Sequence, residues 1–313
     1  MTRILVAGEL NVDLVLSGLP SLPIKGRELI GTDFQVVLGS SSAITAARLA
    51  ALGVIVDFAG IVGDDDFGQF VLRELKHYGV GTKHIQRVVS STGVTIALTY
   101  SQDRALLTYP GTIALYDGRD ITVELLSQYD HLHVGSFFLQ SGLQTALPGV
   151  FQHARKLGLT TSLDVGWDPL EVWGANPYLE PTLAQTDYFF PNESEAQALT
   201  GANGRLESLA ARIKGILLVK RGAEGASAYQ PDGTQVAVPS LPVQVVDTTG
   251  AGDAFNAGFL YARCIEGMEI EKALRFAVAC GAQAVTQVGG ATNAPSATMI
   301  HQFLQNQPEQ NPQ

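Results

Sequence analysis

The sequence predicts an α/β protein whose main β-sheet is mostly parallel, with helices on both faces and a second, small β-sheet beside it. Short runs of β-branched residues alternate with helical patterns for most of the chain, as in the βα units that build a parallel sheet. Two stretches depart from that alternation, because strands and turns occur there with no helix directly after them. The chain is 46% hydrophobic and 16% charged, which provides enough apolar side chains for a core on both sides of a sheet.

The strands of the main sheet are expected where short apolar runs stand between turn residues. The first lies within TRILVAGELNVDLVL, where Glu9 and Asp13 interrupt the apolar run, so this segment is expected to be a strand and not a signal peptide. The expected strands are Ile4–Gly8, Val54–Gly60, Thr160–Asp164, Asp187–Phe190 and Ile216–Lys220.

Helices are expected where apolar residues recur every three or four positions. The first two end at Gly53 and Gly79, and glycine is favoured just after a helix C-cap. The expected helices are Ser42–Leu52, Phe67–Tyr78, Leu143–Leu157, Glu193–Leu199, Asp253–Ile265 and Ile270–Thr286.

The two departures from the βα alternation cover about residues 13–38 and 92–110. They are far apart in sequence, but their strands can pair as one small sheet. Ligands of α/β proteins bind at the carboxyl ends of the strands, so such a sheet would lie over that edge as a lid. Residues 1–305 are expected to form one domain, and 306–313, rich in Gln, Pro and Asn, a disordered tail.

The charge balance argues against several classes of partner. The formal net charge is −10 and no run of Lys or Arg occurs, so neither a nucleic acid nor an anionic membrane is an expected partner. No apolar run approaches the roughly 18 residues of a membrane span. Cys264 and Cys280 lie in apolar helical stretches, where reduced buried thiols are expected, and two cysteines alone cannot form a zinc site. We expect a cytoplasmic protein.

The segment VVDTTGAGDAFNAGF, residues 245–259, carries the clearest chemical signal. Gly250 and Gly252 permit backbone angles that other residues avoid, so successive N–H groups can face one cavity at the start of a helix. Such a cavity attracts anions. Asp253 follows directly, and the helix N-terminus is expected to keep it ionised and ready to accept a proton. For an isolated G-x-G-D, an ordinary aspartate N-cap is the commoner structure.

The string DTTGAGDAF resembles the C-terminal signature of the PfkB family of carbohydrate kinases, which have the ribokinase-like fold. Further segments resemble that family in the same order along nearly the whole chain. They are Gly8–Asp13 (GELNVD), Gly39–Gly53 (GSSSAITAARLAALG), Ile61–Gly68 (IVGDDDFG), Asp187–Gly201, Lys220–Gly225 (KRGAEG) and Ala277–Gly290. The resemblance implies a three-layer α/β/α domain with a small β-sheet lid. It also implies ATP-dependent phosphorylation of a hydroxyl, usually a primary alcohol, of a sugar or sugar-like molecule.

The resemblance also implies roles for single residues of the phosphate-handling half. Gly250, Ala251 and Gly252 would form the anion hole for the transferring phosphoryl group, and Asp253 would be the base. Asp247, with carbonyls near Val285–Gly290, would help to hold a monovalent cation, and a potassium requirement varies across the family. For Asp247, a side chain that caps its own turn is an equal alternative.

The nucleotide and magnesium residues follow from two other segments. Asn192-x-x-Glu195 before a helix has the spacing of a capping box, and the resemblance implies that this pair also organises Mg²⁺ and phosphate through waters. Lys220, at the carboxyl end of a strand, would contact the nucleotide phosphates; its alternative is a surface lysine. Gly222 and Gly225 would belong to the nucleotide site.

The acceptor residues are expected in the N-terminal part. The resemblance implies that Asn11, Asp13, Gly39 and Ser40 face the sugar, with Arg104 of the lid over the closed site. The signature departs from the family at two positions: Ser40 replaces a glycine and Ile44 replaces an asparagine that would bond a sugar hydroxyl. We expect an acceptor that is less hydroxylated there, or one that uses hydroxyls of Ser40–Ser42. Ordinary ribose or fructose specificity is therefore in doubt.

Two other functions stay open from the sequence. A nucleoside kinase would stack a base on Ile44, Phe137 and Phe138, although core packing is the favoured interpretation of both phenylalanines. A catalytically idle sugar-binding or regulatory protein is the other. A phosphofructokinase-like enzyme would need cations for a second phosphate, for which Lys25, Arg27 and Arg104 are available. A homodimer through the lid is expected, because pairing covers exposed sheet edges and an apolar face.

Overall fold

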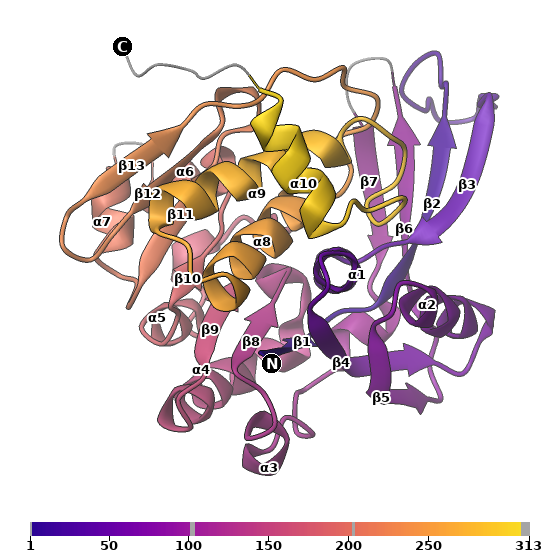
Figure 1. Cartoon of the computed structure of the whole chain (residues 1–313). Coiled ribbons are helices and arrows are strands. Elements are labelled where there is room, and N and C mark those ends of the chain that lie inside the picture. Colours follow the sequence, from indigo (N-terminus) through magenta and orange to yellow (C-terminus); the bar gives the residue numbers. More distant parts are fainter. Residues whose placement is uncertain (1, 101–103, 202–203, 308–313) are drawn as a thin grey trace.

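In the computed structural model, which describes residues 2–100, 104–201 and 204–307, the chain folds into two sheets and flanking helices (Figure 1). Within the described residues the large sheet has nine strands in the order β13-β12-β11-β10-β9-β8-β1-β4-β5. Their bounds are β1 Arg3–Ala7, β4 Ile55–Gly63, β5 Gly81–Val88, β8 His131–Val134, β9 Thr160–Leu163, β10 Tyr188–Phe189, β11 Ile216–Lys220, β12 Ala226–Tyr229 and β13 Gln235–Val238. The pairings between the seven strands from β5 to β11 in this order are all parallel, whereas β12 pairs antiparallel with both β11 and β13.

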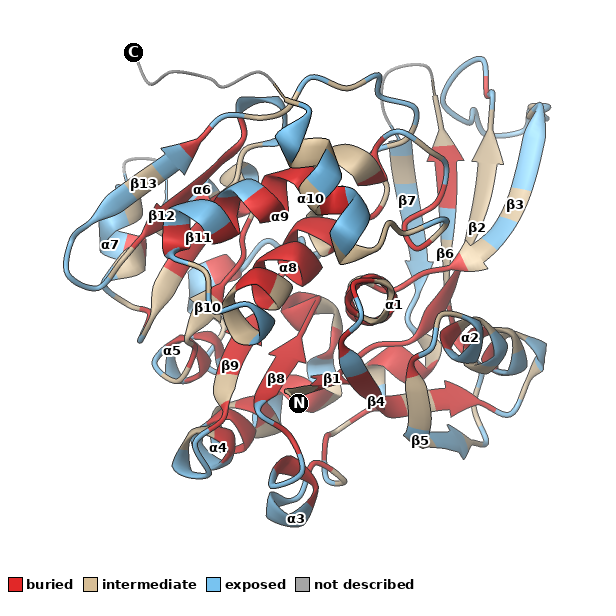
Figure 2. Cartoon of the chain, in the orientation of Figure 1, coloured by how far each residue is buried: buried red, intermediate tan, exposed pale blue. Residues whose placement is uncertain are grey.

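Helices cover both faces of this sheet, which makes three layers. One face packs against α1 Ser41–Ala51, α2 Asp66–His77, α8 Ala251–Leu260, α9 Ile270–Ala284 and α10 Ala297–Gln305. The other face packs against α3 Val123–Leu126, α4 Ser141–Lys156, α5 Leu179–Leu183, α6 Glu193–Thr200 and α7 Leu206–Ala210. Figure 2 shows the buried residues concentrated between the layers. The predicted α/β fold class with a mostly parallel sheet is confirmed.

The central strand β1 shows why the sheet is buried on both faces. Ile4 and Val6 belong to the core under α1 and α8, whereas Leu5 and Ala7 belong to the core over α4. All four are fully buried. A strand that is apolar at every position is typical of a parallel sheet with helices on both sides.

The small sheet lies beside α1 and α2 and has the order β3-β2-β6-β7 (Figure 1). Its strands are β2 Asn11–Ser17, β3 Asp33–Leu38, β6 Gly93–Thr99 and β7 Arg104–Tyr109. They come from the two stretches that depart from the βα alternation, so the predicted second sheet is present. Asp13 pairs with Thr95, and Thr95 with Thr108, so these three side chains share one face. Leu14, Ile96 and Leu107 share the other.

Several elements were not expected from the sequence. The polar edge strand β5, the hairpin β12–β13 and α10 are additional, and the helix expected over Asp253–Ile265 begins at Ala251 and ends in a π-helical turn over Tyr261–Ile265. Apart from residues 306 and 307, the predicted disordered tail lies outside the described residues. None of the described helices has the length and apolar character needed to cross a membrane.

Candidate active site

The glycine turn before α8 lies at the centre of the candidate site. Gly250 adopts φ 74°, and a Cβ there would lie 2.4 Å from the Cα of Gly290, so the position demands glycine on both counts. Ala254 is the residue whose N–H closes the first helical bond, to the carbonyl of Gly250 at 2.8 Å. The first-turn amides at Gly252 and Asp253 therefore lack helical acceptors, as at any helix start, and form an anion-binding surface.

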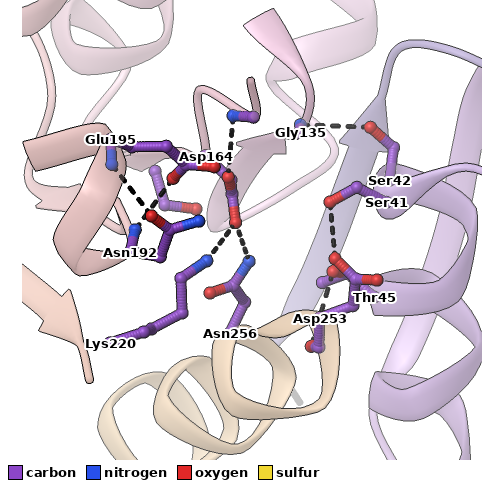
Figure 3. A network of polar contacts seen from close by, with 12 residues as sticks. Ser41, Ser42, Thr45, Gly135, Asp164, Asn192, Glu195, Lys220, Asp253 and Asn256 are labelled. Carbon is purple, nitrogen blue, oxygen red and sulfur yellow. Dashed lines mark hydrogen bonds and ion pairs between the residues drawn. The ribbon is translucent and has the colours of Figure 1, made fainter. Parts of the chain in front are cut away.

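Asp253 lies in this first turn and faces α1 (Figure 3). Ser41 Oγ donates to Asp253 Oδ1 at 2.6 Å. The pKa of Asp253 is raised to about 7, mainly by burial. The hydrogen bond from Ser41 and the charge of Lys220 lower this pKa, whereas the nearby carboxylates of Asp164 and Glu9 raise it. The sequence led us to expect a carboxylate kept ionised by the helix N-terminus. Instead, burial brings the carboxyl into the range where it gains and loses its proton near neutral pH.

Lys220, at the end of β11, contributes a buried cation next to the glycine turn. Its Nζ donates to Asp164 Oδ2 at 2.6 Å, and Asn256 Nδ2 from α8 donates to the same oxygen at 2.6 Å (Figure 3). A Cβ on Gly252 would lie only 3.4 Å from Lys220 Nζ. The ammonium is therefore held within reach of anything bound at the turn. These contacts keep the pKa of Asp164 below its usual range despite its burial.

Asn192 and Glu195 form a complete capping box at the start of α6. Asn192 Oδ1 accepts from the Glu195 amide at 2.9 Å, and Glu195 Oε2 accepts from the Asn192 amide at 2.8 Å. Burial and the neighbouring Asp164 raise the pKa of Glu195 to about 7. The local structure is thus the cap that the spacing predicted.

The carboxyl groups around Lys220 fit a hydrated divalent cation. Asp164 raises the pKa of both Glu195 and Asp253, and all three carboxyl groups interact with the same cation, Lys220. Yet the described residues contain no group of three His, Cys, Asp or Glu close enough to hold a metal ion directly. A surplus of negative charge without a direct cage suits Mg²⁺ that keeps its waters.

A cavity of about 520 Å³ opens next to the glycine turn. Gly222 and Gly225 line it on one side and α8 and α9 on the other, and most of the wall is apolar, including Val243, Val278 and Val285. This size and lining suit a nucleotide base and ribose. The cavity reaches Lys220 and Gly252, so a polyphosphate bound there would end at the turn.

Asp247 is tied into its own loop and into the turn after α9. Its Oδ1 accepts from the amide and the hydroxyl of Thr249, and its Oδ2 accepts from the Gly289 amide at 3.0 Å. The carbonyl of Val285 accepts from the amides of Val246 and Asp247. The two segments expected to share a cation are therefore adjacent.

On the acceptor side, Asn11, Asp13 and Gly39 come together at the base of the small sheet. Asn11 Nδ2 donates to Asp13 Oδ1 at 2.9 Å and to Thr95 Oγ1 at 3.3 Å. A Cβ on Gly39 would lie 2.2 Å from Asp13 Oδ1, so only glycine fits against this carboxyl. The pKa of Asp13 is raised to about 6, because the effect of burial outweighs the lowering effects of the Asn11 amide and the Arg104 charge.

The hydroxyls of Ser40–Ser42 are all engaged within the protein. Ser40 has φ 72° and caps α1, and its Oγ donates to the Glu9 carbonyl at 2.6 Å. Ser42 Oγ donates to the buried Glu9 carboxyl at 2.5 Å, and Ser41 binds Asp253. The expected replacement hydroxyls are therefore not free in this structure.

Of the remaining predicted residues, Arg104 reaches the site, whereas the other four do not. Arg104 Nη1 donates to Thr249 Oγ1 at 2.5 Å, which links the small sheet to the loop before the glycine turn. Lys25 and Arg27 instead lie exposed in the β2–β3 connection. Phe137 and Phe138 are buried in the core over α4, as the favoured interpretation predicted, so neither offers a free face to a base.

The sequence reasoning missed the roles of four residues of this site. Asp164 and Asn256 complete the Lys220 network, and Glu9 and Ser41 complete the Asp253 side. Asp164 stands at the carboxyl end of a predicted strand, the same position that made Lys220 a candidate. Ser41 was expected as one of the hydroxyls that face the acceptor, and no signal in the sequence indicated its contact with Asp253.

Comparisons with known proteins place the chain among sugar kinases. A model of the pfkB family of carbohydrate kinases matches residues 1–297. Ribokinase of Bacillus subtilis is 31% identical over 97% of this chain and 100% of its own length, and the ATP-dependent ribose-1-phosphate kinase of Halopiger xanaduensis is 33% identical over 97% and 98%.

Solved structures agree with this placement. A protein from Escherichia coli in complex with ATP and Mg²⁺ superposes with a TM-score of 0.85 at 25% identity, over 98% of this chain and 100% of that one. Arabidopsis thaliana ribokinase, complexed with ribose and ATP, superposes with a TM-score of 0.83 at 25% identity over the same shares.

Proposed function

Because the chain belongs to the pfkB family of carbohydrate kinases, we propose a specific division of labour among its residues for phosphoryl transfer from ATP to a sugar hydroxyl. The chain is an ATP-dependent carbohydrate kinase. One observation carries the assignment of roles: Asp253 lies in the first turn of α8, directly after the glycine turn and beside the Lys220 network. Base, anion site and cation thus meet at one point, as phosphoryl transfer requires.

In the proposed mechanism Asp253 is the general base. The acceptor hydroxyl loses its proton to Asp253 Oδ2, the carboxyl oxygen that Ser41 does not contact, while the hydroxyl oxygen bonds to the γ-phosphorus. The bond from that phosphorus to the β,γ-bridging oxygen breaks, and ADP leaves. The amides after Gly250 and the Lys220 ammonium bind the charge that develops on the phosphoryl oxygens.

ATP occupies the cavity lined by Gly222, Gly225 and the α8–α9 wall in this proposal. Glu195 and Asn192 would hold Mg²⁺ through waters, and the ion would neutralise phosphate charge. Asp247 and the carbonyls of the turn after α9 hold a monovalent cation, for which potassium is the candidate. The adjacency of these two segments supports that site.

The acceptor is proposed to be a sugar or polyol that enters between the small sheet and α1. Asn11, Asp13 and Gly39 meet its hydroxyls, and Arg104 helps to close the small sheet as a lid over it. Ile44 is buried and lies against Gly290, so it offers no polar contact. Ser40 contributes backbone geometry, since its hydroxyl is occupied.

A nucleoside acceptor remains the second candidate. Nucleoside kinases occur among the structural neighbours, at 20% identity, which shows a shared fold. The buried Phe137 and Phe138 disfavour it. The idle-protein hypothesis is set aside by the family membership.

The proposed assembly is a homodimer in the cytoplasm. Phe34, Val36, Ile96, Leu107 and Tyr109 are exposed on the face of the small sheet opposite Asp13. A second copy would cover this apolar face and the sheet edges. The two cysteines are free thiols, which suits a reducing compartment.

An acceptor panel tests the proposal. ADP release from Mg·ATP is measured with pentoses, hexoses, polyols and nucleosides, each with and without K⁺. Turnover with a sugar or polyol, reduced roughly 10²-fold or more in Asp253→Asn while ATP affinity is kept, supports the assignment. Undiminished turnover in Asp253→Asn would remove Asp253 from the role of base.

A further inference from the structure

Ser41 and Ser42 at the start of α1 donate to two carboxyl groups that belong to different parts of the fold. Figure 3 shows the contact of Ser41 with Asp253. Ser42 donates from its amide and its hydroxyl to Glu9, just after β1. Ser41, one residue earlier, donates to Asp253 on α8 instead. Successive residues at a helix start point about 100° apart, so each hydroxyl reaches one carboxyl only.

Ser41 hydrogen-bonds directly to the carboxyl of Asp253, the proposed base. Among the residues that the structure describes, it is the only side chain that hydrogen-bonds to the Asp253 carboxyl, and it uses Oδ1 alone. The left-handed φ of 72° at Ser40 sets the direction in which α1 begins, and thereby the place of Ser41. The second oxygen of Asp253 is left for the acceptor.

From this geometry we propose that Ser41 is a positioning residue for the general base: it fixes Asp253 through Oδ1, so that Oδ2 receives the acceptor proton. Ser41 keeps its own proton throughout. When the acceptor proton moves to Oδ2, Ser41 continues to donate to Oδ1, which has become the carbonyl oxygen of the acid. The inference rests on the proposed function, in which Asp253 is the base.

The electrostatic surroundings make this one hydrogen bond consequential. A bond donated to the carboxylate favours its charged form, whereas burial and two nearby carboxyls favour the neutral form. Four charged groups from different elements face Asp253: Glu9 after β1, Arg48 of α1, Asp164 after β9 and Lys220 of β11. The Cys280 thiol of α9 interacts with Arg48. Loss of the Ser41 hydroxyl is therefore expected to raise the pKa of Asp253.

A direct titration tests this without any acceptor. The protein is labelled with ¹³C at the aspartate carboxyl carbons, and Asp253→Asn identifies the resonance of Asp253. We expect Ser41→Ala to shift its titration midpoint upward by about one pH unit and Ser41→Thr to restore it. Thr45→Val is the matched control, because the Thr45 hydroxyl contacts the backbone carbonyl of Asp253, at 3.5 Å, and not its carboxyl. In this variant the titration midpoint of Asp253 should stay unchanged. Circular dichroism verifies that each variant is folded.

Turnover provides the second readout, with the acceptor that the panel selects. In Ser41→Ala the acid limb of the pH profile of kcat/KM should move to higher pH together with the titration midpoint of Asp253. Activity at pH 6 should therefore fall about tenfold, and activity at pH 9 should fall less. An equal loss at every pH, or an unmoved Asp253 midpoint, would overturn the inference about Ser41. If Asp253→Asn retains full turnover, the proposed base itself fails, whatever Ser41→Ala does.

Discussion

Arg104 of the small sheet hydrogen-bonds to Thr249 of the loop that leads into the glycine turn, at 2.5 Å between Nη1 and Oγ1. Thr249 in turn donates to Asp247. The small sheet and the phosphate-binding segment, 145 residues apart in sequence, are therefore in direct contact.

This contact predicts a catalytic effect of Arg104 that does not depend on folding. Arg104→Ala should lower kcat/KM for the acceptor about tenfold, because the lid then closes less often over the bound acceptor. Arg119→Ala, which removes an exposed arginine whose ion-pair partner in the described part of the chain is Asp117, should leave kcat/KM unchanged. Thermal unfolding midpoints of both variants should match the parent; a large drop for Arg104→Ala would point to a structural role instead.

The raised pKa of Asp253 predicts the pH profile. The base must be ionised, so kcat/KM should be lost as pH falls through about 7, by about tenfold per unit at lower pH. Glu195 titrates in the same range. In Glu195→Gln the acid limb should therefore remain at the same midpoint, and its disappearance would assign the limb to Glu195. Steady-state rates between pH 5 and 9 measure this.

The same burial predicts a stability gain when the base is removed. The folded pKa of Asp253 lies above the unfolded value, so its contribution to stability is fully present at acid pH and is lost as pH rises through about 7. Asp253→Asn carries no charge. It should raise the unfolding temperature by a few degrees at pH 8 and by less at pH 5. The exposed control Asp33→Asn should show no such pH-dependent difference in calorimetry.

The buried pair of Asp164 and Lys220 predicts strong coupling in unfolding free energy. Loss of one partner leaves a buried charge without compensation, so Asp164→Asn or Lys220→Met alone should cost about 3–5 kcal/mol. The double variant should be less destabilised than the sum of the two. Urea unfolding of the four proteins measures this, and additive losses would show that the ion pair is not a unit.

The apolar face of the small sheet predicts the oligomeric state. Leu107→Lys puts a charge on that face, on the edge strand β7, and should convert the proposed dimer into a monomer in sedimentation equilibrium at micromolar concentration. Leu115→Lys, equally exposed but in the turn after β7, should remain dimeric. A parent protein that sediments as a monomer would refute the proposed dimer.

Much of the fold could be predicted because local signals agreed with the tertiary structure. The Asn192-x-x-Glu195 spacing predicted a capping box, and both of its hydrogen bonds are present. The hairpin β12–β13 and the edge strand β5 were missed because they are short or polar, so their pairing depends on neighbours that a periodicity does not reveal.

The site was predictable in its residues but less so in its electrostatics. Motif resemblance indicated Asp253 and Lys220, yet the pKa of Asp253 depends on burial and on carboxyls from β1 and β9. Those groups lie far away in sequence. Likewise, three adjacent serines gave no indication that two would face Glu9 and one would face Asp253.

The acceptor side and the phosphate-binding side of the site come from different parts of the chain, which has an evolutionary consequence. The side chains proposed to meet the acceptor belong to strands and turns before residue 110, whereas the glycine turn and the nucleotide cavity come from residues after 190. Contacts such as Ser41 with Asp253 and Arg104 with Thr249 join the two sets. A duplicated gene could thus acquire a new acceptor by exchanging two hairpins, with its phosphate donor unchanged.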